Sequence, residues 1–205
     1  SAEFAIFDYD EVTAEYLKGR LDRPASPANP DADADYLDIR TIDLADVEPY
    51  VILPHTIPGN GATLSAFSQK VRIDQAFIGS CANGLIEDLR VAAQIVRGHK
   101  VAPGVRFIVT PGSQAVFLQA AREGLIETLV EAGAVVTNST CGACLGYHMG
   151  VVAPGEVCIT ASTRNFKGRM GSTEARIYMG SPATVAASAL TGVITDPRTL
   201  AGSRA

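Results

Sequence analysis

The chain has no run of eighteen apolar residues, and this absence excludes a typical transmembrane helix. It has no excess of basic residues either, since 17 Lys and Arg face 22 Asp and Glu and the net charge is −5. An acidic chain without a basic face is unsuited to bind nucleic acid or an anionic membrane as its main role. No signal-peptide pattern opens the sequence, which favours a cytoplasmic location.

Cysteine is also scarce, because four in 205 residues are too few for a disulfide scaffold of this size. In a reducing compartment such cysteines are metal ligands or buried thiols. The length allows one large domain or two small ones, and 47% hydrophobic with 19% charged residues indicates a globular protein.

Residues 1–70 are expected to form a lead-in, made of a helix, a connector and an extended segment. Residues 10–20 have helical spacing, residues 23–36 are rich in Pro, Ala and Asp, and residues 36–44 alternate like a strand. Prolines and glycines interrupt residues 47–65, which predicts an extended, irregular path.

Residues 71–205 are expected to form an α/β domain, in which short buried strands alternate with helices. This order predicts a three-layer α/β/α fold with a mainly parallel sheet covered on both faces. The helix after the first strand would bury one face made of Leu85, Leu89, Ala92 and Val96. Strands are predicted at 73–79, 105–111, 134–139, 155–162 and 177–181, and helices at 83–98, 113–124, 125–133 and 182–192, with a short helix or turn at 141–150.

Three cysteines point to chemistry. Cys81 lies in AFIGSCANGLIEDLR, and Cys141 and Cys144 form a C-x-x-C pair in NSTCGACLGYHMG. Each group follows a predicted strand, and ligands of open α/β sheets gather at the carboxyl ends of strands. Iron–sulfur clusters usually take four protein ligands, so a cluster held by three would leave one metal position open for Lewis-acid catalysis.

Spacing alone leaves a zinc site, a cluster and no metal at all about equally open. A C-x-x-C pair can be a redox pair, half a zinc site or two small buried residues. Cys158 or His148 would supply the fourth ligand of a zinc site, although Cys158 is flanked by apolar residues and is expected in the core.

Two arginines favour an anionic substrate. Arg164 and Arg169 lie in the glycine-containing segment STRNFKGRMGS, and paired guanidinium groups suit bidentate recognition of carboxylates. Beside an open metal position, they indicate a dicarboxylate or tricarboxylate. Asn83 would cap the following helix or contribute to the site, and Ser113 is expected to cap the helix after PGS.

Taken in order, IGSCANGLIEDLR, KVAPGVRFIVTPGS, TCGACLG and STRNFKGRMG resemble the aconitase superfamily, nearest to the large subunits of 3-isopropylmalate dehydratase and homoaconitase. The resemblance implies a 4Fe–4S cluster on Cys81, Cys141 and Cys144, with Arg164 and Arg169 binding substrate carboxylates. It also implies a hydro-lyase that moves a hydroxyl group by dehydration and rehydration, a step of leucine biosynthesis in the isopropylmalate enzyme.

The chain departs from this family in two positions and in length. Thr163 replaces an asparagine of the cluster environment, so its donor has a shorter reach, and Ala82 replaces a threonine. Family subunits are about twice as long, and a small subunit or swivelling domain supplies the catalytic base. We therefore expect a portion of a large subunit that is inactive alone. Homoaconitase, aconitase, a non-catalytic zinc-binding domain and RNA binding are the alternatives, the last disfavoured by the acidic charge.

Overall fold

A computed structural model describes residues 5–55 and 60–201 and divides the chain into two units, Ser1–Asp46 and Val47–Ala205. The sequence places the start of the α/β domain at residue 71. In the structure the second unit begins earlier, because two strands from residues 50–63 extend its sheet. No helix within the described ranges is long and apolar enough to cross a membrane.

The described residues of the first unit include one α-helix, α1 (Glu11–Leu17), as predicted. A carboxylate oxygen of Asp10 caps it by accepting the Thr13 N–H at 2.7 Å. The strand predicted at 36–44 is wrong: these residues are irregular and lead into a 3₁₀ turn at Leu44–Asp46. Their apolar side chains are exposed, and no strand within the described residues pairs with them.

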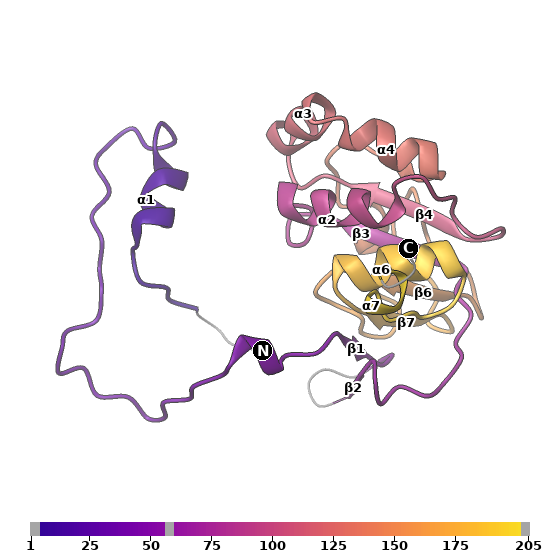
Figure 1. Ribbon diagram of the computed structural model, residues 1–205, viewed down its shortest axis with the longest axis horizontal. Helices are drawn as coiled ribbons and strands as arrows, with labels where there is room; N and C mark the ends of the chain where they lie inside the picture. The colour runs from indigo at the N-terminus through magenta and orange to yellow at the C-terminus, as the bar shows by residue number, and fades with distance from the viewer. Residues whose placement is uncertain (1–4, 56–59, 202–205) are drawn as a thin grey trace. The chain divides into compact units, whose positions relative to one another are not determined.

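A seven-stranded mixed sheet forms the second unit, with the order β2-β1-β7-β6-β3-β4-β5 among the described residues (Figure 1). The five strands from β3 to β7 run parallel, which confirms the predicted α/β fold with a mainly parallel sheet. The antiparallel pair β1–β2 is added beside β7 at one edge. The strands are β1 (Tyr50–Ile52), β2 (Gly61–Thr63), β3 (Gln75–Gly79), β4 (Arg106–Thr110), β5 (Val135–Val136), β6 (Val157–Thr160) and β7 (Arg176–Met179).

Helices cover one face of this sheet and enclose the main hydrophobic core (Figure 1). They are α2 (Ile86–Val96), α3 (Gln114–Arg122), α4 (Leu125–Ala132) and α6 (Pro182–Thr191), and α2 contacts each of the other three. The hydroxyl of Ser113 accepts the Val116 N–H at 3.2 Å, which confirms the predicted cap of α3. A short C-terminal helix, α7 (Arg198–Ala201), follows α6.

The buried face of α2 differs from the predicted one by its first member. Leu85 is the N-cap residue and is 50% exposed, because the helix begins only at the next residue. Ile86 is buried instead, together with Leu89, Ala92 and Val96. The period was correct, but the chain before the first helical turn does not follow it.

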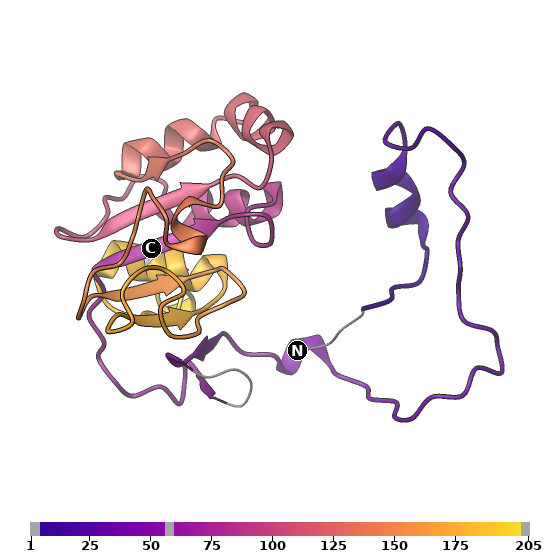
Figure 2. The ribbon, with the colours of Figure 1, turned by 180° about the vertical axis from the view of Figure 1, so that it is seen from behind.

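The opposite face of the sheet carries a smaller core under irregular chain and one short helix, α5 (Gly142–Leu145) (Figure 2). Side chains alternate between the two cores along each strand. In β3, Ala76 and Ile78 face the helical side, whereas Phe77 faces the side of α5. Both faces are therefore covered, but the second layer is mostly loop.

Candidate functional site

The predicted cysteine ligands follow the carboxyl ends of two parallel strands, β3 and β5, that flank β4. Cys81 comes two residues after β3, and Cys141 precedes α5 after β5. The strand between them, β4, is joined to this edge, because the Thr137 N–H donates to the Val109 carbonyl and the hydroxyls of Thr110 and Thr137 lie 2.7 Å apart. Helix α5 also contacts β3. The fold thus places residues about 60 positions apart in the sequence at the carboxyl ends of the parallel strands.

A compact turn presents Cys81, whose side chain is exposed. Ser80 has a φ of 77°, a left-handed conformation that is uncommon for a residue other than glycine, and its N–H donates to the Thr110 carbonyl at 3.1 Å. Gly84 allows the turn to close against β4, since a Cβ there would lie 2.6 Å from the Ser80 oxygen and 2.7 Å from the Thr110 oxygen. The backbone around the thiol is therefore held by contacts that tolerate no side chain.

The C-x-x-C pair is split between solvent and interior. Cys141 occupies the N-cap position of α5 and is exposed, whereas Cys144 lies within the helix and is buried. The Leu145 N–H donates to the Cys141 carbonyl at 3.1 Å, which holds the turn between them. One thiol therefore faces outward and the other lies against the second core.

Arg169 lies directly against Cys144. Its Nε donates to the Cys144 carbonyl at 2.7 Å, and one of its terminal nitrogens lies 3.6 Å from the Cys144 sulfur. The guanidinium also lies over the ring of Phe166, 5.5 Å from its centroid. The structure thus places an arginine predicted to bind substrate beside a cysteine predicted to bind metal.

Arg164 lies on the same loop but is exposed, and it donates to the Thr163 hydroxyl at 3.3 Å. Between the two arginines, the fully buried Asn165 anchors the loop. Its amide donates to the carbonyls of Leu53 at 2.8 Å and Ile177 at 3.0 Å. The loop is thus fixed at its middle while its charged side chains stay accessible.

Asn83 does not cap α2. Its amide donates to the Ala161 carbonyl, which ties the Cys81 turn to the end of β6. Asp88 accepts the Leu85 N–H instead and closes the first turn of α2. Asn83 also lines a cavity of about 570 Å³ with residues that follow β6 and β7, including Ser162 and Ser181. An open space thus adjoins the turn that carries Cys81.

The remaining cysteine and the histidine do not complete a zinc site. Cys158 is fully buried and pairs with Gln75, the first residue of β3, so it lies at the other end of the strands from Cys81. Burial raises the pKa of its thiol to about 12, as expected of a core residue. The exposed His148 lies 3.4 Å from the Thr140 hydroxyl.

Three thiols fit an iron–sulfur cluster by donor type, but they are not gathered into a ligand set. In the described ranges, no three His, Cys, Asp or Glu side chains are close enough together to hold a metal ion. The Ser139 hydroxyl, two residues before Cys141, is buried there and has no hydrogen-bond partner. The sequence did not identify Ser139 as a donor, because its only distinguishing feature is its position beside the C-x-x-C pair.

The second unit is a mainly parallel α/β domain in which Cys81 and Cys141 follow the carboxyl ends of strands and Arg169 contacts Cys144. Residues 63–192 match the Aconitase family (aconitate hydratase), and the chain belongs to this family. It is 59% identical over 198 residues to the 3-isopropylmalate dehydratase large subunit of Mycolicibacterium smegmatis, covering 97% of this chain and 47% of that protein.

Two further relatives bear comparable names. The 3-isopropylmalate dehydratase large subunit of Clostridium botulinum is 50% identical over 192 residues, covering 94% of this chain and 45% of the relative. The 3-isopropylmalate dehydratase large subunit 2 of Rubrobacter xylanophilus is 51% identical over 199 residues, covering 97% and 46%. The chain therefore spans a little under half the length of these curated relatives.

Proposed function

We propose that this chain is the cluster-bearing portion of an iron–sulfur hydro-lyase large subunit of the 3-isopropylmalate dehydratase type, which acts in the cytoplasm in leucine biosynthesis. The observation that carries the proposal is the contact of Arg169 with Cys144, because it places a guanidinium suited to carboxylates beside a thiol that we propose as a cluster ligand. The names of the relatives, each a dehydratase large subunit, support the same substrate class.

Cys81, Cys141 and Cys144 would hold a 4Fe–4S cluster. When bound, such a cluster supplies an iron with an open coordination position that acts as a Lewis acid toward a hydroxyl group. The protein residues bind and orient the substrate. Arg164 extends into solvent and Arg169 is fixed against α5, so the two can engage different oxygens of a hydroxy dicarboxylate.

Hydrogen-bond donors around the thiols complete the site in this proposal. The Ser139 hydroxyl, two residues before Cys141, is buried without a hydrogen-bond partner, and the Thr163 hydroxyl takes the place of a longer amide. Donors to sulfur stabilise the negative charge of a thiolate-ligated cluster and tune its potential. The described residues include no assigned general base, which we expect from a small subunit or swivelling domain.

Metal and sulfide analysis of the full chain tests the ligand assignment. After anaerobic reconstitution we expect about four irons and four acid-labile sulfides per chain. Serine variants of Cys81, Cys141 and Cys144 should each lose this content, whereas the matched control Cys158→Ser should retain it. Stoichiometric zinc without sulfide, or loss of the cluster only in Cys158→Ser, would overturn the assignment.

An activity assay tests the assembly. The chain alone should not turn over 3-isopropylmalate, whereas adding the rest of a large subunit and a small subunit should restore turnover. In that assembly Arg164→Lys and Arg169→Lys should each raise KM by about tenfold or more, because lysine cannot form the bidentate contact. The helix-surface change Arg122→Lys is the control. Turnover by the pure chain would refute the need for partners.

A further inference from the structure

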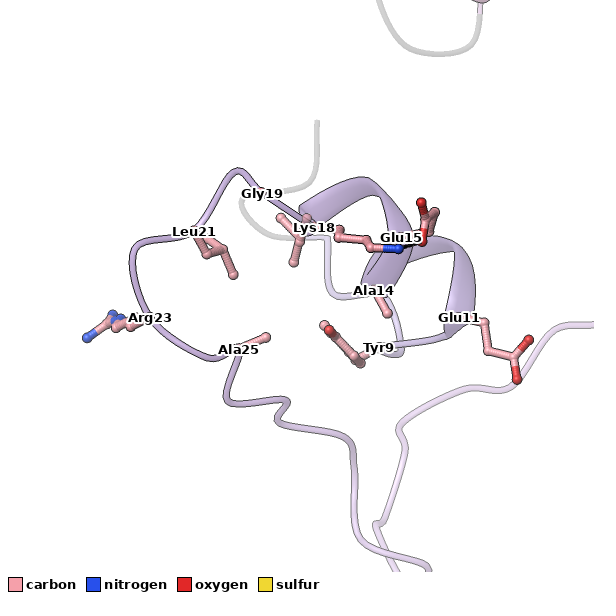
Figure 3. A pocket seen from close by; sticks show the side chains of 10 residues that line it. Tyr9, Glu11, Ala14, Glu15, Lys18, Gly19, Leu21, Arg23 and Ala25 are labelled. Carbon is pink, nitrogen blue, oxygen red and sulfur yellow. Dashed lines mark hydrogen bonds and ion pairs between the residues drawn. The ribbon is translucent and has the colours of Figure 1, made fainter.

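Polar contacts in this chain range from local pairs to a network that joins distant segments. In the first unit, Lys18 at the end of α1 forms an ion pair with Glu15 at 3.4 Å, beside the hollow at residues 9–25 (Figure 3). A pair three residues apart stabilises its own helix and fixes no other segment. Gln75, the first residue of β3, is the opposite case, because its side chain is fully buried and its contacts join three segments of the second unit.

The amide of Gln75 has both of its ends bonded. Its Nε2 donates to the Gly150 carbonyl at 2.8 Å and lies 3.8 Å from the Cys158 sulfur, and its Oε1 accepts the Arg106 Nε–H at 3.1 Å. A carbonyl can only accept and a guanidinium can only donate, so these partners decide which end of the amide faces which segment. Burying an amide is costly unless both ends are bonded, and this side chain is therefore held in one orientation.

Arg106, the first residue of β4, is itself fixed. Its terminal nitrogens donate to the two carboxylate oxygens of Glu156 at 2.7 and 2.8 Å, a bidentate pair that a lysine could not form. Glu156 also accepts the Ala153 N–H at 2.8 Å and so closes the turn before β6. The side chains of Arg106 and Glu156 are 45% and 24% exposed, so the pair is the solvent end of a network whose inner end is Gln75.

The carbonyl that Gln75 binds belongs to a residue that supports α5. Gly150 has a φ of 127°, and a Cβ there would lie 2.5 Å from the Ile108 Cδ1 and 2.9 Å from the Ala143 Cβ. Its backbone therefore packs directly against β4 and α5. Ala143 lies between the two cysteines of the C-x-x-C pair. A shift of Gly150 would thus change the support of the turn that carries both thiols.

Helix α5 depends on contacts of this kind. It has four residues, far fewer than an isolated helix needs in water. The core on its side of the sheet is the smaller one, with nine buried apolar residues in the described ranges. Arg169 donates to the Cys144 carbonyl at 2.7 Å, and Gly150 contacts Ala143. The position of the two thiols is therefore set by residues outside the helix.

We propose that Gln75 is a positioning residue for the C-x-x-C segment, residues 141–150. Its bond to Gly150 keeps that residue against α5 and thereby sets where both thiols lie. Arg106 and Glu156 keep its amide in the orientation that this bond requires. The proposal rests on the proposed function only where it treats the two thiols as cluster ligands, because the placement of the segment does not depend on the reaction.

Hydrogen–deuterium exchange on the reduced, metal-free chain tests the placement. Gln75→Met keeps an unbranched side chain of similar size and removes both ends of the amide. The exchange rate of residues 141–150, divided by that of α2, should rise about tenfold, since a general loss of stability would speed both. The matched control Ile177→Val weakens the same core without touching the amide and should change this ratio by less than about threefold.

The reconstituted chain supplies a measurement that a purely structural role would not change. At equal iron and sulfide content, the reduced cluster of Gln75→Met should give an electron paramagnetic resonance spectrum with shifted g values, because the spectrum depends on the geometry and hydrogen bonding of the ligands. Ile177→Val should match the unchanged chain. Failure of Gln75→Met alone to take up the cluster would support the positioning role as well.

A second variant tests the network at its exposed end. Glu156→Gln keeps the size of the side chain and weakens its bidentate pair with Arg106. It should raise the exchange ratio about threefold in the unchanged chain and add nothing in the Gln75→Met background, because it acts through Gln75. If Gln75→Met does not fold, Glu156→Gln takes its place in both measurements.

Four results would overturn the proposal. They are an unchanged exchange ratio in Gln75→Met or, where that variant does not fold, in Glu156→Gln; identical spectra at equal cluster content; additive effects in the double variant; and an equal rise of the ratio in Ile177→Val, which would mean that core packing positions the segment. A chain that shows the expected exchange but takes up no cluster would refute the proposed function and leave the role of Gln75 intact.

Discussion

The buried thiol of Cys158 should resist alkylation far more than its chemistry in an unfolded chain would allow. Burial raises its pKa from 9.0 to about 12. At pH 8 about one thiol in ten is ionised at the lower value and about one in ten thousand at the higher value. Because only the thiolate reacts, the native rate should be lower by about a thousandfold, before any steric exclusion is counted.

The assay is a time course with iodoacetamide at pH 8, in which each cysteine peptide is quantified by mass spectrometry. The same cysteine in urea gives the unfolded rate, so the comparison needs no variant. The exposed Cys81 and Cys141 should be modified readily in the native chain and show that the reagent is active. If native labelling of Cys158 is slowed by less than about a hundredfold, the thiol is not in the dry core described here.

Three further predictions concern stability. The pKa of Cys158 is higher in the folded than in the unfolded chain, so its contribution to the free energy of unfolding is complete below about pH 9 and is lost as the pH rises toward about 12. In urea unfolding, the free energy of unfolding should therefore fall more steeply with pH in the unchanged chain than in Cys158→Ala. Equal slopes in the two proteins would contradict this. Asn165→Ala should lower the free energy of unfolding by about 2–4 kcal/mol in the same assay, since two carbonyls lose their donor, whereas the exposed Asn138→Ala should change it little. Gly84→Ala should cost about 1–3 kcal/mol by overpacking. Gly84→Ala should lower the free energy of unfolding more than Gly104→Ala, because open space around Gly104 leaves only the strain of a positive φ. A smaller loss for Gly84→Ala than for Gly104→Ala would refute the close approach of Gly84 to the Ser80 and Thr110 oxygens.

Periodicity predicted the strands and helices of the second unit well, because the pattern of each element is contained in its own residues. Buried strands are short apolar runs and the helices have apolar residues at regular spacing, so each element was identified from its own residues. The Ser113 cap followed from the same local chemistry, whereas the Asn83 cap did not form because its amide donates to the Ala161 carbonyl. The boundaries were less certain: Leu85 fits the helical period but precedes the first turn, and the period does not define where a helix begins.

The sequence did not predict which distant segments pair as strands. Residues 36–44 alternate as a strand does, yet they have no partner, whereas Tyr50–Ile52 lie in a segment broken by prolines and still join β7. Whether a segment becomes a strand depends on an available edge, which is a property of the folded sheet. This is also why β1 and β2 appear before the predicted start of the domain.

The positions of Cys81 and Cys141 after strands were predicted from the sequence, but the contacts around them were not. The strand-to-turn position of Cys81 and Cys141 indicated a common edge, and the structure places both there. The contact of Arg169 with Cys144 and the isolated hydroxyl of Ser139 arise from loops that fold back over the sheet, and no local pattern encodes them. Ligand assignment and substrate contacts remain predictions for the experiments above.

The two faces of the sheet have unequal shares of the buried apolar residues. In the described ranges, 26 such residues cluster on the helical side and only nine on the side of α5. The helical side should therefore set the free energy of global unfolding, while the α5 side opens locally at lower cost. Exposed residues near the thiols can then change over evolution with little penalty to folding, so the reactive edge can diversify while the scaffold stays the same.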